Sequence, residues 1–357
     1  MSREIFYIEH SSHYHCVYTW LKILNSPNQN IFISDDLIPN MVEFNKTYLE
    51  KSKVYSIKSS IGHVVISFLR NKTKPCLIIT TAPEHAMGLY EILVVLIYIL
   101  VKPDILCIRN PQIWVTQKST YKLLKIKHKL LTFISKKLLK TLYFRSVNVV
   151  CESSLQVNFM KTHLGSRNHV KFFSGRVSDL RPTNAKINNN PIGSIIGVLG
   201  SVDKMRRDYD QLFQSILEIP IENRPKLAFL GALKESVDII FPIKDFIYFY
   251  SDTFVSEEIF FKIGTQCRFL ISPLRKEKAY GAAYGSGSFA DAIALNKLLL
   301  LPSHVPVPEE FGSFVKHYDS QNSLVQILGQ VTDQSQLLLQ SSFDKFTLAA
   351  SKNDLIC

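Results

Sequence analysis

The sequence predicts an α/β protein of two doubly wound, Rossmann-like domains that face each other across a cleft. Its 357 residues, 46% of them hydrophobic, exceed what one core usually organises and suffice for two. Short apolar, β-branched runs alternate with segments of helical spacing, a pattern typical of parallel sheets covered by helices. A polar stretch at 179–192 separates two such series, so we expect one sheet on each side of it.

The candidate strands of the first series are short and rich in β-branched residues. They are Ile5–Ile8, Ile31–Ser34, His63–Phe68, Cys76–Thr80, Asp104–Ile108 and Val147–Cys151. Helical spacing is found at Val17–Leu24 and Leu89–Val101, which would cover the sheet.

The second series repeats this arrangement. Its candidate strands are Ser194–Leu199, Leu227–Leu230, Phe246–Tyr250, Arg268–Ser272, Leu298–Leu301 and Phe314–Tyr318, and its candidate helices are Tyr209–Leu217, Glu257–Ile263 and Ser288–Leu295. We therefore expect an N-terminal domain at 1–178, a linker at 179–192, a C-terminal domain at 193–345 and a tail at 346–357.

Composition limits the compartment and the partners. The N-terminus has no apolar run long enough for a signal peptide, and the six cysteines are scattered without a CxxC pair, so we expect a cytoplasmic protein with reduced thiols. The longest apolar stretch, Ile92–Val101, is too short to span a membrane. The net charge of +12 points to an anionic partner: nucleic acid, an anionic membrane surface or a diphosphate ligand.

The first group of candidate binding residues follows the strand that begins the second series. Gly200 and Ser201 come after the strand, and a basic turn with Lys204, Arg206 and Arg207 leads into a helix. Such a turn places backbone N–H groups and cations where a phosphate would dock. Three cations at the start of a helix also oppose its dipole, which an anionic ligand would relieve. The alternative is a basic turn in contact with solvent.

The second group lies where a later strand leads through a polar loop to a helix. Ser286, Gly287 and Ser288 leave the helix start open, so a diphosphate could approach its free N–H groups closely. Asp291, one turn into the helix, could accept from a ribose hydroxyl. An ordinary helix capped by Ser286 or Ser288 is the alternative. Because both groups follow strands of one sheet, at the edge where open α/β sheets bind ligands, we predict a nucleotide-diphosphate site there.

Candidate catalytic residues follow the first strand of the first series. His13 and His15 would face the cleft, where a histidine could take the proton of an attacking hydroxyl. A cap for the following helix is the alternative, and no Cys/His pattern in the sequence supports a metal site. Glu84 and His85 lie in another strand-to-helix loop and would line the same side, although Pro-Glu is also a good helix start.

The segment 117–145 is basic and carries no Asp or Glu. Its cations are Lys118, Lys122, Lys125, Lys127, Lys129, Lys136, Lys137, Lys140 and Arg145. Leucines recur between them at near-helical spacing, so the segment could lie on an anionic membrane or pack on the sheet with its basic face in solvent. Because the charge concentrates in this segment and one phosphate-type turn, without interleaved aromatic stacking groups or a recognised nucleic-acid module, we do not expect a nucleic-acid partner.

Several local patterns resemble the GT-B glycosyltransferases, in particular bacterial enzymes that assemble surface polysaccharides such as capsule and O-antigen. Val147–Ser154 looks like the last strand and polar turn of the first domain of that family. The other matching patterns are Gly197–Asp203 with Lys204 and Arg207 at the donor phosphates, Phe249–Glu258 beside the nucleobase, and Ser286–Ser288 with Asp291 in the donor-site helix. The match covers most of 147–320 and only the general plan before it.

The resemblance implies transfer of a hexosyl group from a nucleotide-diphosphate sugar to a glycan or polyprenyl-linked acceptor. The C-terminal domain would hold the donor and the N-terminal domain the acceptor. Lys204 and Arg207 would neutralise the leaving diphosphate in place of a metal ion, so no cofactor is expected. Arg176 at the hinge and Tyr280 would face the cleft. The enzyme would work in the cytoplasm, at the inner face of the plasma membrane where its acceptor is lipid-linked.

The chain departs from the family at one place. Many retaining members carry two glutamates eight positions apart, where this sequence has Ala283 and Asp291, so retention and inversion both stay open. The missing glutamate also favours one alternative, a catalytically silent protein of the same fold that binds glycan or tethers an assembly to the membrane. Another alternative is a nucleotide-sugar epimerase, for which no paired carboxylates stand out.

Overall fold

The computed structural model describes most of both halves of the chain. The described residues are 4–10, 17, 19–21, 24, 29–39, 41, 52–70, 74–83, 89–116, 126–165, 170–172, 195–253, 255–276, 280 and 287–330. These residues form two compact units, the first within 4–172 and the second within 195–330. The predicted boundaries near 178, 192 and 345 fall outside the described residues and stay predictions, as does the cleft between the units.

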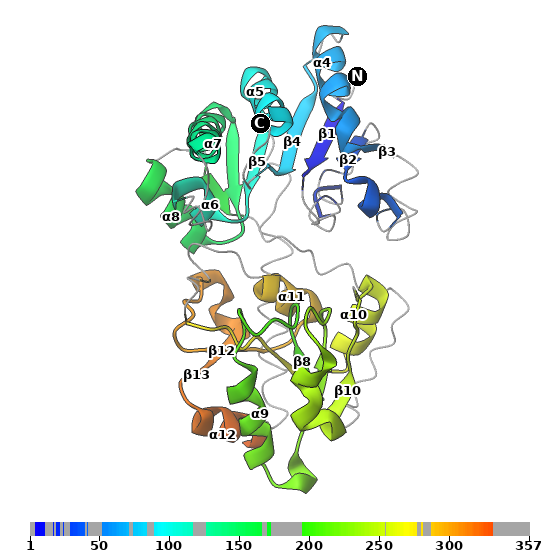
Figure 1. Ribbon diagram of the computed structural model, residues 1–357, viewed down its shortest axis with the longest axis vertical. Helices are drawn as coiled ribbons and strands as arrows, with labels where there is room; N and C mark the ends of the chain where they lie inside the picture. The colour runs from blue at the N-terminus through cyan, green and yellow to red at the C-terminus, as the bar shows by residue number, and fades with distance from the viewer. Residues whose placement is uncertain are drawn as a thin grey trace. The chain divides into compact units, whose positions relative to one another are not determined.

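The first unit is built on a seven-stranded sheet in which every pairing is parallel. Its strands are β1 (Ile5–Glu9), β2 (Gln29–Ile33), β3 (Ser52–Ser56), β4 (Cys76–Thr81), β5 (Ile105–Ile108), β6 (Asn148–Cys151) and β7 (Val170–Phe172). The spatial order is β3-β2-β1-β4-β5-β6-β7, so the direction of winding reverses between β1 and β4 (Figure 1). This is the doubly wound topology expected from the sequence.

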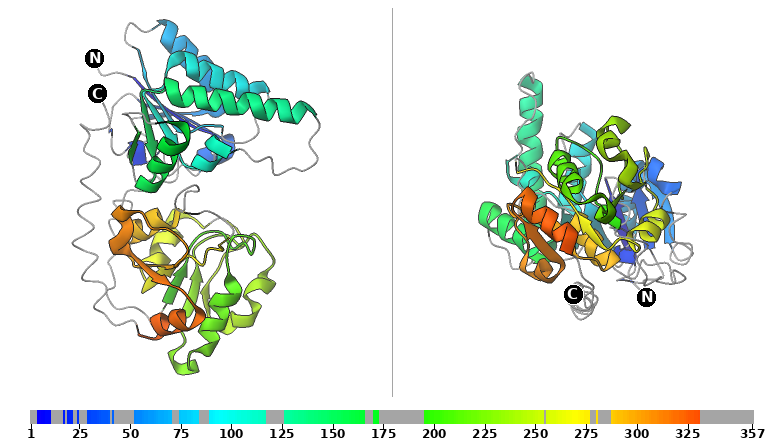
Figure 2. Two further views of the ribbon diagram at one scale, coloured as in Figure 1. Left: turned by 90° about the vertical axis from the view of Figure 1, so that its left-hand side faces the viewer. Right: turned by 90° about the horizontal axis from the view of Figure 1, so that it is seen from below.

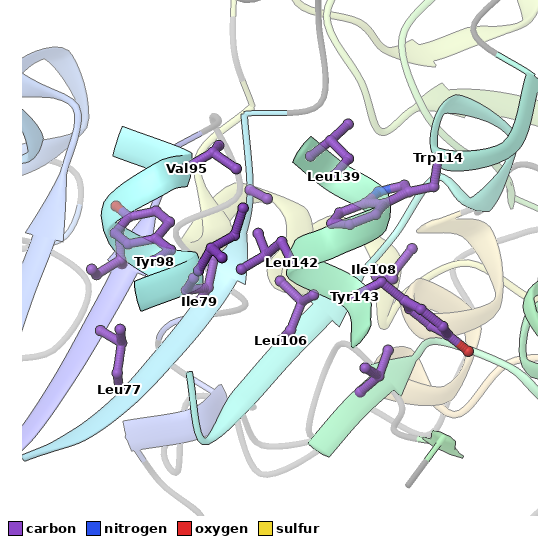
Figure 3. Packing of buried hydrophobic residues seen from close by; sticks show 14 of the residues in the cluster. Leu77, Ile79, Val95, Tyr98, Leu106, Ile108, Trp114, Leu139, Leu142 and Tyr143 are labelled. Carbon is purple, nitrogen blue, oxygen red and sulfur yellow. The ribbon is translucent and has the colours of Figure 1, made fainter. Parts of the chain in front are cut away.

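Helices cover both faces of this sheet. They include α4 (Ser60–Arg70), α5 (Leu89–Val101), α6 (Pro111–Thr116), α7 (Ile126–Arg145) and α8 (Ser154–Leu164), with short 3-10 turns at Asp35–Leu37 and Ile57–Ser59. Figure 3 shows Val95 and Tyr98 of α5 and Leu139 and Leu142 of α7 turned towards the strand residues beneath them. On the other face, Trp20 and neighbouring apolar residues form a second buried cluster with the strand residues Ile5, Tyr7 and Ile31. Burial on both faces explains why the strands β1, β2, β4 and β5 read as continuous apolar runs.

The prediction of a strand at His63–Phe68 is wrong, because these residues lie in helix α4. The run is β-branched and apolar, and a short run of that kind does not distinguish strand from helix. Burial follows a helix: Val64 is fully buried whereas Ile66 is 48% exposed. Strands β3 and β7 were not predicted, since β3 has no fully buried residue and therefore lacks the apolar signal.

The second unit holds a six-stranded parallel sheet. Its strands are β8 (Ile195–Val198), β9 (Lys226–Phe229), β10 (Ile247–Phe249), β11 (Phe269–Ile271), β12 (Leu299–Pro302) and β13 (Val315–Tyr318), in the order β10-β9-β8-β11-β12-β13. Its helices are α9 (Tyr209–Glu218), α10 (Glu257–Gly264), α11 (Gly287–Leu295) and α12 (Gln321–Gln330), with 3-10 segments at Ile221–Asn223, Val237–Phe246 and Glu309–Phe314. All the strands of this sheet were predicted.

The described cysteines are free, as their scattered spacing in the sequence led us to expect. Cys76, Cys107, Cys151 and Cys267 are buried free thiols, as predicted, whereas the remaining cysteines lie outside the described residues. Within the described residues, no helix combines the length and the apolar character that crossing a bilayer requires.

Candidate functional site

The carboxyl ends of β8 and β11 lie side by side in the second unit. Ile271 pairs with Val198, and β8 pairs with β9 on its other side, so the winding direction reverses between β8 and β11. Open α/β sheets bind ligands at such a switch point. The two groups of polar residues that the sequence placed after strands of one sheet therefore follow neighbouring strands.

The loop after β8 is held from inside by Arg207. This side chain is only 5% exposed, and its guanidinium donates from Nε to the carbonyl of Leu199 (3.1 Å) and from Nη1 to the carbonyl of Ser201 (2.7 Å). Burial is the main cause that lowers the pKa of Arg207, and the charge of Arg206 adds to it. Arg207 thus organises the loop, and its predicted contact with a phosphate stays a prediction.

Two glycines allow the loop to close around this guanidinium. Gly200 has a φ of +77°, and a Cβ there would lie 2.1 Å from Nη2 of Arg207. After β9, a Cβ on Gly231 would lie 2.4 Å from the carbonyl carbon of Gly200 and 2.8 Å from the nitrogen of Ser201. The loops after β8 and β9 therefore touch backbone to backbone.

Arg275, in the loop after β11, bonds to the same basic turn. Its Nε donates to the carbonyls of Lys204 (2.8 Å) and Arg207 (3.1 Å), and its backbone N–H donates to the carbonyl of Arg206 (3.0 Å). The N–H of Asp208 in turn donates to the carbonyl of Pro273 (2.7 Å). The loops after β8 and β11 are consequently one structure, although about 70 residues of sequence separate them.

Four cations meet at this edge: Lys204, Arg206, Arg207 and Arg275. Lys204 is exposed, Arg206 and Arg275 are half-buried, and Arg206 Nε donates to the hydroxyl of the buried Tyr280 (2.8 Å). Where the chain is described, none of the four forms a salt bridge. Like charges held this close repel one another, so the edge is suited to a ligand that carries negative charge.

Three carboxylates in and beside this turn accept hydrogen bonds from backbone N–H groups. Asp203 accepts from the N–H of Met205 (2.9 Å), Glu235 accepts from the N–H of Lys204 (2.7 Å), and Asp208 accepts from Gln211 at the N-terminus of α9. These bonds are typical of turns and helix caps. The carboxylates shape the loop that carries the cations.

The start of α11 lies beyond the end of β11. Gly287 is exposed, and a Cβ there would meet no atom within 4 Å. This open space is what a ligand that approaches the helix start closely would require. Ser288 is buried inside the helix and donates to the hydroxyl of Ser272 (3.0 Å), so it ties α11 to the strand and is not the helix cap. Asp291 lies within the helix, half-buried. Its ribose contact stays a prediction, and Ser286 lies outside the described residues.

His13 and His15, the predicted catalytic residues, lie outside the described part of the chain. The same holds for Glu84, His85 and Arg176, which were predicted to line the cleft, so all these roles stay predictions. The described residues contain no group of three or more His, Cys, Asp or Glu side chains that could hold a metal ion.

Sequence reasoning missed Glu9, the last residue of β1 at the switch point of the first sheet. Its side chain is fully buried, and Oε2 accepts from the hydroxyls of Thr80 (2.8 Å) and Thr81 (2.9 Å) at the end of β4. A carboxylate at the end of an apolar strand is the local signal. The two threonines that hold it come from a strand about 70 residues later, and only the parallel pairing of β1 with β4 brings them together.

His10, next to Glu9, contacts helix α5. Its Nε2 lies 2.8 Å from the hydroxyl of Tyr98, and burial lowers the pKa of His10 to about 4. The imidazole is therefore neutral near pH 7, and it connects the end of β1 to the helix layer.

Several solved structures share this architecture. HepE of Anabaena in complex with UDP superimposes with a TM-score of 0.65 at 9% identity, over 98% of each chain. A putative UDP-N-acetylglucosamine 2-epimerase from Listeria monocytogenes gives 0.60 at 10% identity over 98% of this chain and 94% of that one. A UDP-forming α,α-trehalose-phosphate synthase from Burkholderia vietnamiensis gives 0.54 at 8% identity over 99% and 96%.

No family model and no curated protein matches the chain. At these identities the likeness concerns the fold. Its two parallel, Rossmann-like sheets are those of the GT-B glycosyltransferase structures, as the sequence predicted.

Arg207→Ala and Lys204→Ala test whether Arg207 stabilises the loop after β8 while the exposed Lys204 does not. Loss of Arg207 leaves the carbonyls of Leu199 and Ser201 without their donor, so we expect the free energy of unfolding to fall by about 2–4 kcal/mol. Lys204→Ala should change it by less than about 0.5 kcal/mol. Urea unfolding followed by circular dichroism measures both, and equal effects would contradict the inward role of Arg207.

Gly231→Ala tests the backbone contact between the loops after β8 and β9. The added Cβ would meet backbone atoms that cannot rotate away, so we expect a loss of about 1–3 kcal/mol in the free energy of unfolding. Gly329→Ala is the matched control in α12, where a Cβ meets no atom within 4 Å and should stabilise the helix by about 0.5–1 kcal/mol. A neutral effect at Gly231 would show that the loops are not in contact.

His10 should make the stability depend on pH. The unfolded chain binds a proton at His10 below pH about 6.5, whereas the folded chain does so only near pH 4. The free energy of unfolding is therefore undiminished by His10 above pH about 6.5, and it falls by up to about 3 kcal/mol as the pH falls to 4. His10→Gln should lose less stability over this window in urea unfolding. Parallel pH profiles of the two proteins would rule out the shift.

Proposed function

We propose that this chain transfers a sugar from a nucleoside-diphosphate sugar, bound at the carboxyl edge of the second sheet, to a hydroxyl of a glycan or lipid-linked glycan. The observation that carries the proposal is the group of four cations at that edge without a salt-bridge partner among the described residues. The open start of α11 supports it, since helix N-termini bind phosphate groups. The similarity to a structure solved with UDP makes UDP the first nucleotide to test.

In the proposed reaction, the bond between the anomeric carbon and the diphosphate breaks and its electron pair leaves with the diphosphate. The acceptor oxygen bonds to the anomeric carbon, and a base takes its proton. Lys204 and Arg275 would stabilise the charge that grows on the leaving diphosphate, in place of a divalent metal. Arg207 would fix the loop and supply positive charge from beneath. Asp291 would bind the ribose.

The acceptor side of the proposal rests on the sequence. His13 or His15 would take the acceptor proton, while Glu84, His85 and Arg176 would line the same side. A bacterial surface polysaccharide is the acceptor class that the sequence resemblance favours. Retention or inversion of configuration would be read directly from the anomeric signals of the product by nuclear magnetic resonance.

An epimerase is the second candidate, because one similar structure is described as a putative UDP-N-acetylglucosamine 2-epimerase. A transferase joins its sugar to an added acceptor, whereas an epimerase changes the sugar without one. Incubation with UDP-sugars, with and without a glycan acceptor, followed by product analysis distinguishes the two. A protein that binds nucleotide but yields neither product would be a silent binding protein of the same fold.

The nucleotide site is tested by isothermal titration and thermal shift with UDP, GDP, ADP, CMP and TDP. We expect one diphosphate to raise the melting temperature, because a ligand of the native state stabilises it by mass action. Lys204→Ala should weaken binding about tenfold or more, since hydrogen bonds to charged groups contribute about 1.5–3 kcal/mol. Lys226→Ala is the control. Lys226 is also exposed, but it begins β9 and so lies at the amino ends of the strands, away from the proposed site.

Nucleotide binding to the two variants distinguishes a specific site from a general effect of charge. Binding that is lost in Lys204→Ala and kept in Lys226→Ala supports a donor site at this edge. Equal losses in both variants would indicate a general effect of charge, and no binding of any of the five nucleotides would overturn the proposal.

A further inference from the structure

Helices α5 and α7 lie side by side and cover one face of the first sheet (Figures 1 and 2). Their inward residues, among them Val95, Tyr98, Leu139 and Leu142, are fully buried against the strands (Figure 3). Because Leu139 and Leu142 are buried, the described part of the basic segment packs on the sheet through its leucines, while the environment of its basic face stays a prediction. Those leucines cannot reach a membrane, so any contact must use the outward residues of the two helices.

The outward face of α5 is apolar. Leu93, Leu96 and Leu100 are 52%, 41% and 75% exposed, and Tyr90 is 44% exposed. Leu93, Leu96 and Leu100 are spaced three and four residues apart, so they form one row along the helix. A helix that is apolar on its outer side as well as its inner side normally meets another apolar phase.

The outward face of α7 adds aromatic rings and cations to this surface. Phe133 and Phe144 are 54% and 40% exposed, and the ammonium groups of Lys137 and Lys140 lie 4.6 and 6.0 Å from their ring centroids. Lys136 is also exposed, and α7 contains no Asp or Glu. The outer surface of α5 and α7 therefore combines exposed leucine and phenylalanine with lysines that no carboxylate of α7 balances.

We propose that this outer surface of α5 and α7 binds the anionic surface of a lipid bilayer. The leucine row and the phenylalanines would enter the boundary between headgroups and acyl chains, while the lysines would reach the lipid phosphates. A second copy of this chain fits less well, because a two-fold contact would set the lysines of one α7 against those of the other. The inference is independent of the nucleotide site.

Cosedimentation of the full chain with lipid vesicles tests the proposal. Vesicles of phosphatidylcholine alone are compared with vesicles that also contain phosphatidylglycerol, at low and raised salt. We expect binding only to the anionic vesicles, weakening as salt screens the lysines. Equal binding to both vesicle types, or to neither, would overturn the proposal.

The apolar arm of the test is Leu93→Gln with Leu100→Gln. Both side chains are exposed, so the melting temperature should stay that of the wild type while vesicle binding falls more than about tenfold. Ile221→Gln with Phe241→Gln is the matched control, since these residues are 70% and 63% exposed on the second unit. Unchanged vesicle binding in the leucine variant, or an equal loss in the control, would contradict the assignment of this surface.

Lys137→Gln with Lys140→Gln tests the role of the positive charge. Both lysines are exposed, so we expect this variant to fold even if the leucine variant does not. Each lysine near an anionic surface favours binding about fivefold, so the pair should lower it more than about tenfold. Lys226→Gln with Lys244→Gln is the control; Lys244 also lies over an exposed ring, 4.9 Å from the centroid of Phe241. If light scattering instead finds a dimer that the leucine substitutions dissociate, a second copy occupies this surface and the proposal fails.

Discussion

The second unit depends on the burial of one positive charge, the guanidinium of Arg207. A buried charge must be compensated, and here backbone carbonyls of Leu199 and Ser201 do so in place of a carboxylate. The left-handed backbone at Gly200 and the close approach of Gly231 follow from closing the loop around this group. Because carbonyl dipoles bind a cation without cancelling its charge, the edge of the sheet remains positive.

The switch points of the two sheets differ in electrostatic character. In the second sheet, Arg206, Arg207 and Arg275 gather at the carboxyl ends of β8 and β11. In the first sheet, the corresponding position between β1 and β4 holds the buried carboxylate of Glu9 with its threonine donors. One topology thus presents a cationic edge in one unit and an acidic group in the other.

In the helix layer of the first unit, positive charge lies on the outer surface, beside exposed apolar residues. In its described part, helix α7 buries Leu139 and Leu142 against the sheet and exposes Lys136, Lys137 and Lys140, whereas α5 has apolar residues on both its inner and outer sides. Exposed rows of leucine are unfavourable in water, so a surface of this kind is retained where another phase or partner covers it. The lysines beside it decide which partner fits, because they favour an anionic surface.

The sequence by itself determined the two-sheet architecture, all the strands of the second sheet, the bounds of α5, and the cationic turn after β8, because periodicity and strand-end position are local properties. It misassigned His63–Phe68, where a β-branched run is equally compatible with a helix, and missed the edge strand β3. Only the tertiary structure decided that Arg207 points inward, that Arg275 joins the same turn, and that Glu9 meets Thr80 and Thr81. These contacts join loops of distant sequence, and the direction of a long side chain depends on which carbonyls the fold brings within its reach.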